Sequence, residues 1–196
     1  MSNGKGIGLP APAESPVRPP GNDSRVVVVC CDGTANEFSR DNTNVVRLYS
    51  TLLADPARQV ACYHPGLGTM EAAGALTSWG RWVTKQLGRI SGYGLEADLR
   101  DLYVFLMRTY RPGDRLFLFG FSRGAYTVRA LVGLLRFYGL MEAGNEAMVP
   151  YAIRLLVAAD RTIEGDAAKR DEAFRLVGRF KATFGTRRCR PYFVGV

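Results

Sequence analysis

A serine between two glycines is the residue of this sequence with the clearest chemical potential. Gly120, Ser122 and Gly124 form a G-x-S-x-G pattern, after the apolar run Leu116–Phe119 and before a helical pattern. This context predicts a strained strand-to-helix turn that exposes the serine, with glycines where side chains would collide with neighbouring backbone. The pattern predicts Ser122 as a catalytic nucleophile and the Arg123 N–H as an oxyanion donor. The alternative is an ordinary Gly-rich turn with a capping serine.

A second segment with chemical potential is Asp32-Gly33-Thr34, which follows an apolar run at 26–31. If that run is a strand beside the serine strand, Gly33 and Thr34 are candidate backbone donors to an oxyanion. Asp32 either orients this loop or forms a simple turn, and the sequence leaves both open. The triplet also resembles the end of the D-x-D-G-T motif of haloacid-dehalogenase phosphatases. Cys30 stands where their nucleophilic aspartate would be, so phosphotransfer is a minor alternative.

The sequence contains a single histidine, His64, on which any chemistry that needs an imidazole of this chain depends. It follows a short apolar run at 60–63, and so is predicted at the same edge of a parallel sheet as Ser122. His64 precedes the serine and is followed by Pro65, whereas hydrolase triads run Ser, Asp/Glu, His along the chain. We therefore interpret His64 as a site-lining residue, with a role as general base as the alternative.

The elements that position these residues alternate between strand and helix patterns. Apolar runs predict strands at 26–31, 60–63, 115–121 and 191–196, and helical periodicity predicts helices at 43–53, 95–110, 123–138, 146–160 and 166–182. This alternation predicts an α/β fold, in three layers (α/β/α) with a mostly parallel sheet. Such sheets bind ligands beyond the carboxyl ends of their strands, where the loops after Cys31, Tyr63 and Phe121 would meet.

The remaining composition narrows the class of protein. Residues 1–24 are rich in Pro, Gly, Ser and Ala, which predicts a disordered tail before a folded part at 25–196. No apolar run reaches the roughly 18–20 residues that cross a bilayer, and no signal peptide is visible, so we expect a cytoplasmic chain. The four cysteines have no C-x-x-C spacing, so buried thiols are expected, with no metal site or cofactor.

The formal net charge of +8 is concentrated towards the C-terminus. Residues 161–196 carry nine Lys/Arg and four Asp/Glu, a difference of +5. A solvated helix face is the first interpretation of this stretch, and peripheral contact with an anionic membrane is the second. No motif for nucleic acid is found, so no nucleic-acid partner is expected.

Taken in order, several segments resemble the bacterial type VI secretion lipase effectors of the first class and the wider uncharacterised α/β-hydrolase family around them. The matching segments are Cys31–Thr34 with Asn36, Asn42–Val45, Tyr63–Thr69, Gly113-Asp114, Leu116–Ala125 and Phe193–Val196. The resemblance implies a serine hydrolase that cleaves carboxylic esters, in lipids or phospholipids, through an acyl-serine intermediate. It also implies export as an effector as an alternative to the cytoplasm.

The C-terminal end departs from this family. The family's last matching strand continues into Trp-Asp-Thr-Val, with the triad Asp and a later His expected beyond it, whereas this sequence ends at Val196. We therefore expect residues 25–196 to be the N-terminal part of an α/β-hydrolase domain, weakly active or inactive alone, with an exposed strand edge and poor solubility. The alternative is an inert relic or binding module that uses the Gly-rich crevice. Acyl preference and oligomeric state stay open.

Overall fold

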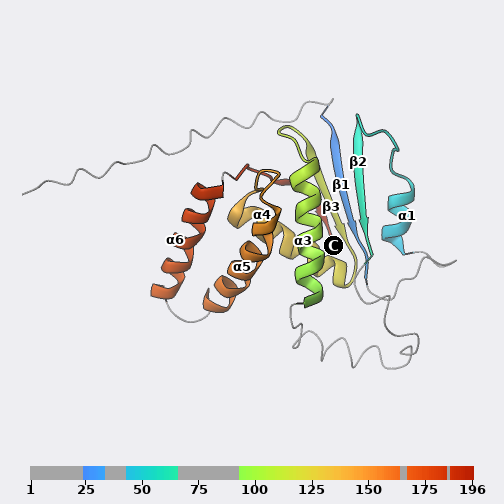
Figure 1. The fold of residues 1–196 in the computed structure, drawn as a ribbon. Coiled ribbons are helices and arrows are strands. Elements are labelled where there is room, and N and C mark those ends of the chain that lie inside the picture. The colour runs from blue at the N-terminus through green and yellow to red at the C-terminus, as the bar shows by residue number, and fades with distance from the viewer. Residues whose placement is uncertain (1–23, 34–42, 66–92, 164–166, 185) are drawn as a thin grey trace, which may run out of the picture.

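Strands and helices alternate along the part of the chain that the computed structural model describes, which is residues 24–33, 43–65, 93–163, 167–184 and 186–196 (Figure 1). The elements are β1 (Val26–Cys31), α1 (Asn44–Ser50), β2 (Gln59–His64), α3 (Tyr93–Thr109), β3 (Arg115–Gly120), α4 (Arg123–Tyr138), η1 (Glu146–Met148), α5 (Val149–Ile163), α6 (Ala167–Phe184) and β4 (Pro191–Gly195). Except for Ser24, the predicted tail at 1–24 lies outside the described residues.

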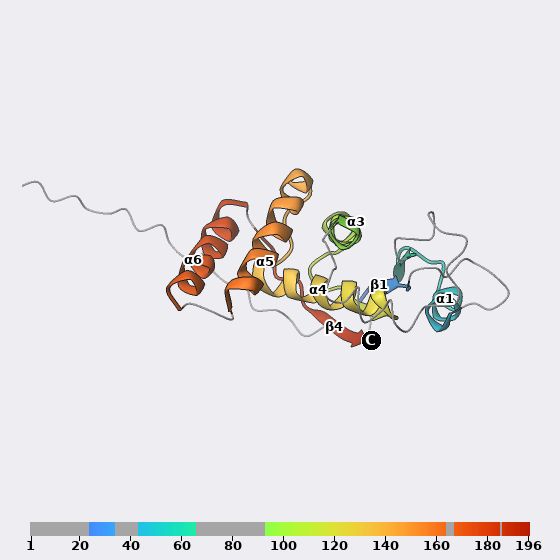
Figure 2. The ribbon, with the colours of Figure 1, turned by 90° about the horizontal axis from the view of Figure 1, so that it is seen from below.

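The four described strands form one parallel sheet in the order β2-β1-β3-β4. Its register sets Cys31 of β1 opposite both His64 of β2 and Gly120 of β3. α1 packs on β1 and β2 from one side, α3 and α4 cover the other side, and α5 and α6 lie outside α4 (Figures 1 and 2). The predicted three-layer α/β fold is therefore confirmed.

β1 lies at the centre because its residues are apolar on both faces, as in strands that are covered from two sides. Val28 and Cys30 join the small core beneath α1, whereas Val27, Val29 and Cys31 join the larger core beneath α3 and α4. All five are buried. The sheet's carboxyl edge, where β1 and β3 end, is thus held by packing on both sides.

The helix boundaries differ from the predicted ones in small, explicable ways. α1 ends at Ser50 rather than at 53, because Thr51 and Leu52 donate to carbonyls three residues back and so tighten the last turn. The helix predicted from 146 begins as the short 3₁₀ turn η1 and continues as α5. Among the described helices, none is both long and apolar enough to cross a membrane.

β4 lies at one edge of the described sheet and exposes apolar side chains. Tyr192 is 62% exposed and Val196 68%, with Phe193 and Val194 also exposed. α1 packs on β1 and β2, on the other half of the sheet (Figure 2). Such an edge offers unpaired backbone groups to a second strand. The expected exposed edge is therefore present in the described part of the chain.

Candidate active site

Ser122 occupies a strained turn between β3 and the buried helix α4. Its φ is 54° and its ψ is −120°, which makes it the one non-glycine residue with positive φ in the described part of the chain. The Phe121 N–H fixes the turn by donating to the Cys31 carbonyl of β1 at 3.0 Å. Ser122 is exposed and precedes α4, yet its side chain makes no capping hydrogen bond within the described residues. This geometry disfavours the ordinary capping interpretation.

The two glycines of the pattern stand where a side chain would overlap backbone. A Cβ at Gly120 would lie 2.6 Å from the Gly124 carbonyl oxygen and 2.7 Å from Cα of Ala125. A Cβ at Gly124 would lie 2.7 Å from the Asp32 carbonyl oxygen and closer still to the Cys31 carbonyl. Gly124 therefore lets the first turn of α4 rest directly on the end of β1.

The predicted oxyanion donors have different surroundings. The Arg123 N–H belongs to the first turn of α4, where the helix dipole favours negative charge. The Gly33 N–H instead donates to Oδ1 of Asp32 at 2.7 Å. To hold an oxyanion, the Gly33 N–H would have to leave that carboxylate, so its role as an oxyanion donor stays a prediction. Thr34 lies outside the described residues.

Asp32 is fully buried and joins three elements at the carboxyl edge. Besides Gly33, its carboxylate accepts hydrogen bonds from the Thr43 hydroxyl and, at 3.0 Å, from the Tyr63 hydroxyl of β2. Thr43 in turn caps α1 by accepting from the Val46 N–H at 3.2 Å. Burial, reinforced by the Asp32 carboxylate, raises the pKa of Tyr63. This network favours the loop-orienting interpretation of Asp32 over an isolated turn.

His64 lies at the end of β2. It faces a carboxylate that is not among the site residues predicted from the sequence. Its Nε2 is 3.7 Å from Oδ1 of Asp98 on α3, and the two side chains are only 16% and 10% exposed. Burial lowers the pKa of Arg123, and the Asp98 carboxylate opposes that shift. Burial also raises the pKa of Cys31, with Asp98 among the further causes. Asp98 thus lies beside the end of β2.

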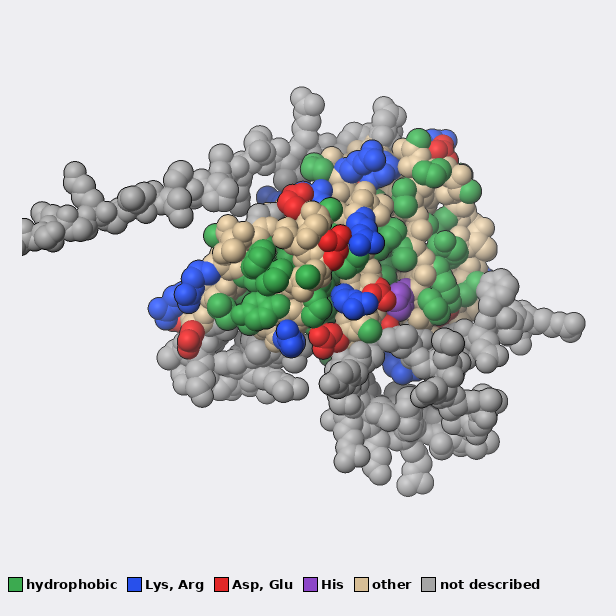
Figure 3. Space-filling model, in the orientation of Figure 1, with side chains coloured by type: hydrophobic (Ala, Val, Ile, Leu, Met, Phe, Trp, Pro, Cys, Tyr) green, Lys and Arg blue, Asp and Glu red, His purple; other side chains and the backbone are tan. Residues whose placement is uncertain are grey.

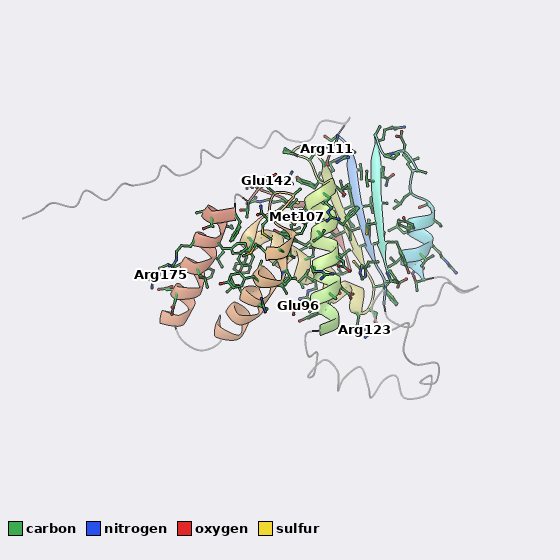
Figure 4. The ribbon with its side chains drawn as sticks, viewed as in Figure 1. Glu96, Met107, Arg111, Arg123, Glu142 and Arg175 are labelled. Atoms are coloured by element: carbon green, nitrogen blue, oxygen red, sulfur yellow. The ribbon has the colours of Figure 1, made fainter. Side chains whose placement is uncertain are left out.

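The sequence contains a pattern from which Asp98 could have been identified as a site residue. Asp98 falls on the apolar face of α3, three residues after Leu95 and four before Leu102, and next to the buried Leu99. A carboxylate on the packed stripe of an otherwise amphipathic helix needs a partner. Figure 4 shows Glu96 of α3 and Arg123 at the same end of the molecule. His64, which faces Asp98, comes from a segment far from it in the sequence.

The thiols do not support the phosphotransfer alternative. Burial raises the pKa of Cys30 to about 11, and its side chain is fully buried, so it is a poor nucleophile at neutral pH. Among the described residues, no group of His, Cys, Asp and Glu side chains is placed to hold a metal ion. On the face shown in Figure 3, basic and acidic side chains are interspersed, and the solvated helix face expected for residues 161–196 stays a prediction.

The fold and the serine turn together define a three-layer α/β protein with its candidate site at the carboxyl edge of a parallel sheet. The chain belongs to the family described as T6SS, phospholipase effector Tle1-like, catalytic domain, which matches residues 25–196. This membership confirms the resemblance found in the sequence.

One curated relative is a yeast protein. The chain is 33% identical over 132 residues to the uncharacterized protein YEL023C of Saccharomyces cerevisiae (strain ATCC 204508 / S288c). The match covers 64% of this chain and 19% of the yeast protein, so the chain spans about a fifth of that relative's length. No solved structure matches the chain.

Proposed function

We propose that this chain carries the nucleophile of a serine hydrolase that cleaves carboxylic esters of lipids. The observation that carries the proposal is the strained, exposed and uncapped Ser122 between β3 and α4. In the reaction, the Ser122 oxygen attacks the ester carbonyl carbon and gives up its proton, and the alcohol leaves with a proton. Water then hydrolyses the acyl-serine to release the acid and restore the hydroxyl.

Charge that develops on the carbonyl oxygen would be stabilised by the first turn of α4. The Arg123 N–H and the positive end of the helix dipole face the same edge as Ser122. Gly33 would add a second donor once its N–H leaves Asp32, and Thr34 is the further candidate in this loop. Asp32 holds this loop against α1 and β2 and so acts as a positioning residue.

The remaining part of the machinery is a general base, for which His64 is the candidate in this chain. The chain has one imidazole, and its Nε2 faces Asp98. A serine hydroxyl without a base is a weak nucleophile, so we expect the 196-residue chain to turn esters over slowly. The same proposal includes two further expectations for this chain. One is peripheral contact with an anionic membrane, and the other is export as an effector.

A fluorophosphonate probe tests whether Ser122 is activated. We expect the probe to label the wild-type chain and the control variant Ser50→Ala, which loses an exposed serine of α1, but not Ser122→Ala. Labelling that persists in Ser122→Ala would refute the assignment. Rapid ester turnover that both Ser122→Ala and His64→Gln abolish would contradict the expected slow turnover and identify His64 as the base.

A binding module without chemistry is the second candidate. It is favoured by one observation, namely that the Gly33 N–H is occupied by Asp32 rather than held open for an oxyanion. A chain of this kind would bind lipid at the carboxyl edge of the sheet, and Ser122 would react with the probe no faster than Ser50. The same labelling experiment therefore separates the two candidates.

A further inference from the structure

Two aromatic side chains next to Ser122 in the chain are exposed and have no role in the chemistry proposed above. Phe121, the residue before the serine, is 50% exposed, and Tyr126, the fourth residue after it, is 47% exposed. Ring contacts join aromatic residues elsewhere on α4, α5 and α6, but none involves Phe121 or Tyr126 among the residues that the structure describes. Two large apolar side chains thus remain open beside the predicted nucleophile.

The positions of these two residues are ones that usually close the start of a helix. The residue before an N-cap often packs against the fourth residue of the helix, and this contact fixes how the chain enters the helix. With Ser122 as the N-cap of α4, these two positions are Phe121 and Tyr126. Ser122 has a φ of 54° and a ψ of −120° instead of the extended backbone usual at an N-cap, so the chain enters α4 at a different angle. Both rings are therefore available to contact something else.

An acyl chain bound to Ser122 would begin between these two residues. In the acyl-serine of the proposed function, the carbonyl carbon is bonded to the Ser122 oxygen, so the first carbons of the chain lie beside Phe121. Residues four apart on a helix are neighbours on its surface, which puts Tyr126 one turn beyond the serine. Methylene groups that lie against these rings leave water, and their transfer from water is favourable.

The apolar surface along this side of α4 is short. From the start of the helix, where Figure 4 labels Arg123, the first turn leads to Tyr126. Four residues of helix rise about 6 Å, and with C–C bonds of about 1.5 Å a chain of about six carbons reaches from Ser122 past the Tyr126 ring. The next exposed residue of α4 is Arg129, whose charged group favours water. Carbons beyond this length would therefore gain little.

We propose that Phe121 and Tyr126 are specificity-determining residues that bind the acyl chain of the ester and favour chains of about six carbons. This inference rests on the proposed function, because it names the acyl preference of the same site. The chain lies against the two rings while the Ser122 oxygen bonds to the carbonyl carbon. Each methylene that leaves water in this way lowers the barrier from free chain and free ester to the acylation step.

Acylation of Ser122 by p-nitrophenyl acetate, hexanoate and decanoate tests this preference. The second-order rate constant is measured by release of p-nitrophenolate, and the rate of the Ser122→Ala chain is subtracted. A methylene that leaves water completely raises such a rate constant about fourfold, and one that lies on a half-exposed ring about twofold. Hexanoate has four methylenes more than acetate, so it should react at least about tenfold faster. Decanoate should react within about threefold of hexanoate, because its last carbons extend past the rings.

Three variants assign the preference to the rings. Tyr126→Ser, like Phe121→Ser, should lower the ratio of the hexanoate to the acetate rate constant by about threefold or more. Tyr126→Phe keeps the ring and should keep this ratio within about twofold of the wild-type ratio. The matched control is Tyr192→Ser, which removes an exposed tyrosine at the start of β4, level with the start of β3 and not with its end, and should leave the ratio unchanged. A thermal melt checks each variant, and Tyr126→Ser decides if Phe121→Ser fails to fold.

Several results would overturn the inference. Equal rate constants for acetate and hexanoate would refute the acyl contact, and a decanoate rate about tenfold above that of hexanoate would refute the preferred length. A ratio that stays unchanged in Tyr126→Ser, or that falls as far in Tyr192→Ser, would refute the assignment to these rings. In each of these cases Ser122 still reacts, so the hydrolase itself would stand. Failure of the fluorophosphonate probe to label Ser122 would instead refute the hydrolase.

Discussion

Gly124→Ala is the sharpest test of how the serine turn is built. The added Cβ would lie 2.7 Å from the Asp32 carbonyl oxygen and closer to that of Cys31. Both oxygens belong to the backbone at the end of the central strand β1, so no flexible side chain can yield. Relief therefore requires the first turn of α4 to move away from β1, and Ser122 moves with it.

The magnitude follows from two opposing effects. Overpacking of this kind lowers the free energy of unfolding by about 1–3 kcal/mol. Alanine in place of glycine in a helix raises it by at most about 1 kcal/mol. We expect a net loss of about 1–2 kcal/mol in the free energy of unfolding. For a chain of this size the thermal midpoint should fall by roughly 2–8 °C. Because the turn shifts, labelling of the serine by fluorophosphonate should slow by at least about tenfold.

Gly133→Ala in the same helix is the matched control. The nearest atom to its added Cβ is Cδ2 of Leu156 at 4.0 Å, an ordinary contact. This variant should be as stable as the wild type or more stable by up to about 1 kcal/mol, with unchanged labelling. If Gly124→Ala matched Gly133→Ala in both the melt and the labelling rate, the contact between α4 and β1 would not hold the turn, and the reasoning would be refuted.

Four further predictions concern the groups around this edge and the rest of the sheet. Arg25→Met breaks an ion pair with Asp114 at 2.6 Å, and should lower the free energy of unfolding in urea by about 3 kcal/mol; a loss below about 0.5 kcal/mol would place the pair among weak surface contacts. Asp32→Asn disrupts the hydrogen bonds that this carboxylate accepts, and should cost about 1–3 kcal/mol and slow labelling of the serine; unchanged labelling would contradict its positioning role. Burial raises the pKa of Cys30 to about 11, so the native thiol should react slowly with iodoacetamide at pH 8 and faster as the pH rises towards 11; rapid native alkylation at pH 8 would contradict its burial. Val194→Lys places a charge on the exposed edge strand and should raise the concentration at which the chain aggregates, as measured by light scattering. An unchanged aggregation concentration would mean that the chain associates through a surface other than this edge.

The strands and the serine turn could be predicted because their signals are local. The β-branched run at 26–31 is apolar on both faces, and it becomes the central strand β1 for that reason. The backbone passes so close to Gly120 and Gly124 that any sequence with this turn needs glycine at both positions. Neither inference needed contacts between distant residues.

The polar network could not be predicted because it depends on register. Tyr63 reaches Asp32 because β2 pairs with β1 so that Cys30 lies opposite Tyr63, and nothing in either strand alone sets that pairing. The same carboxylate draws in the Gly33 N–H, which the motif alone had suggested was free for a substrate. A backbone donor cannot be counted as available until the nearby side-chain acceptors are placed.

The conformation of Ser122 supports a functional role more strongly than the motif does. A non-glycine residue in such a region costs about 1–3 kcal/mol, and a glycine at the same position would avoid most of that cost. A serine that repaid the cost by capping α4 would be explained by structure alone, but its side chain makes no such bond within the described residues. Within the described residues, helix capping therefore does not explain the strain. What the strain does achieve is to hold a hydroxyl in the open beside the first turn of α4, which is the arrangement that attack on an ester requires.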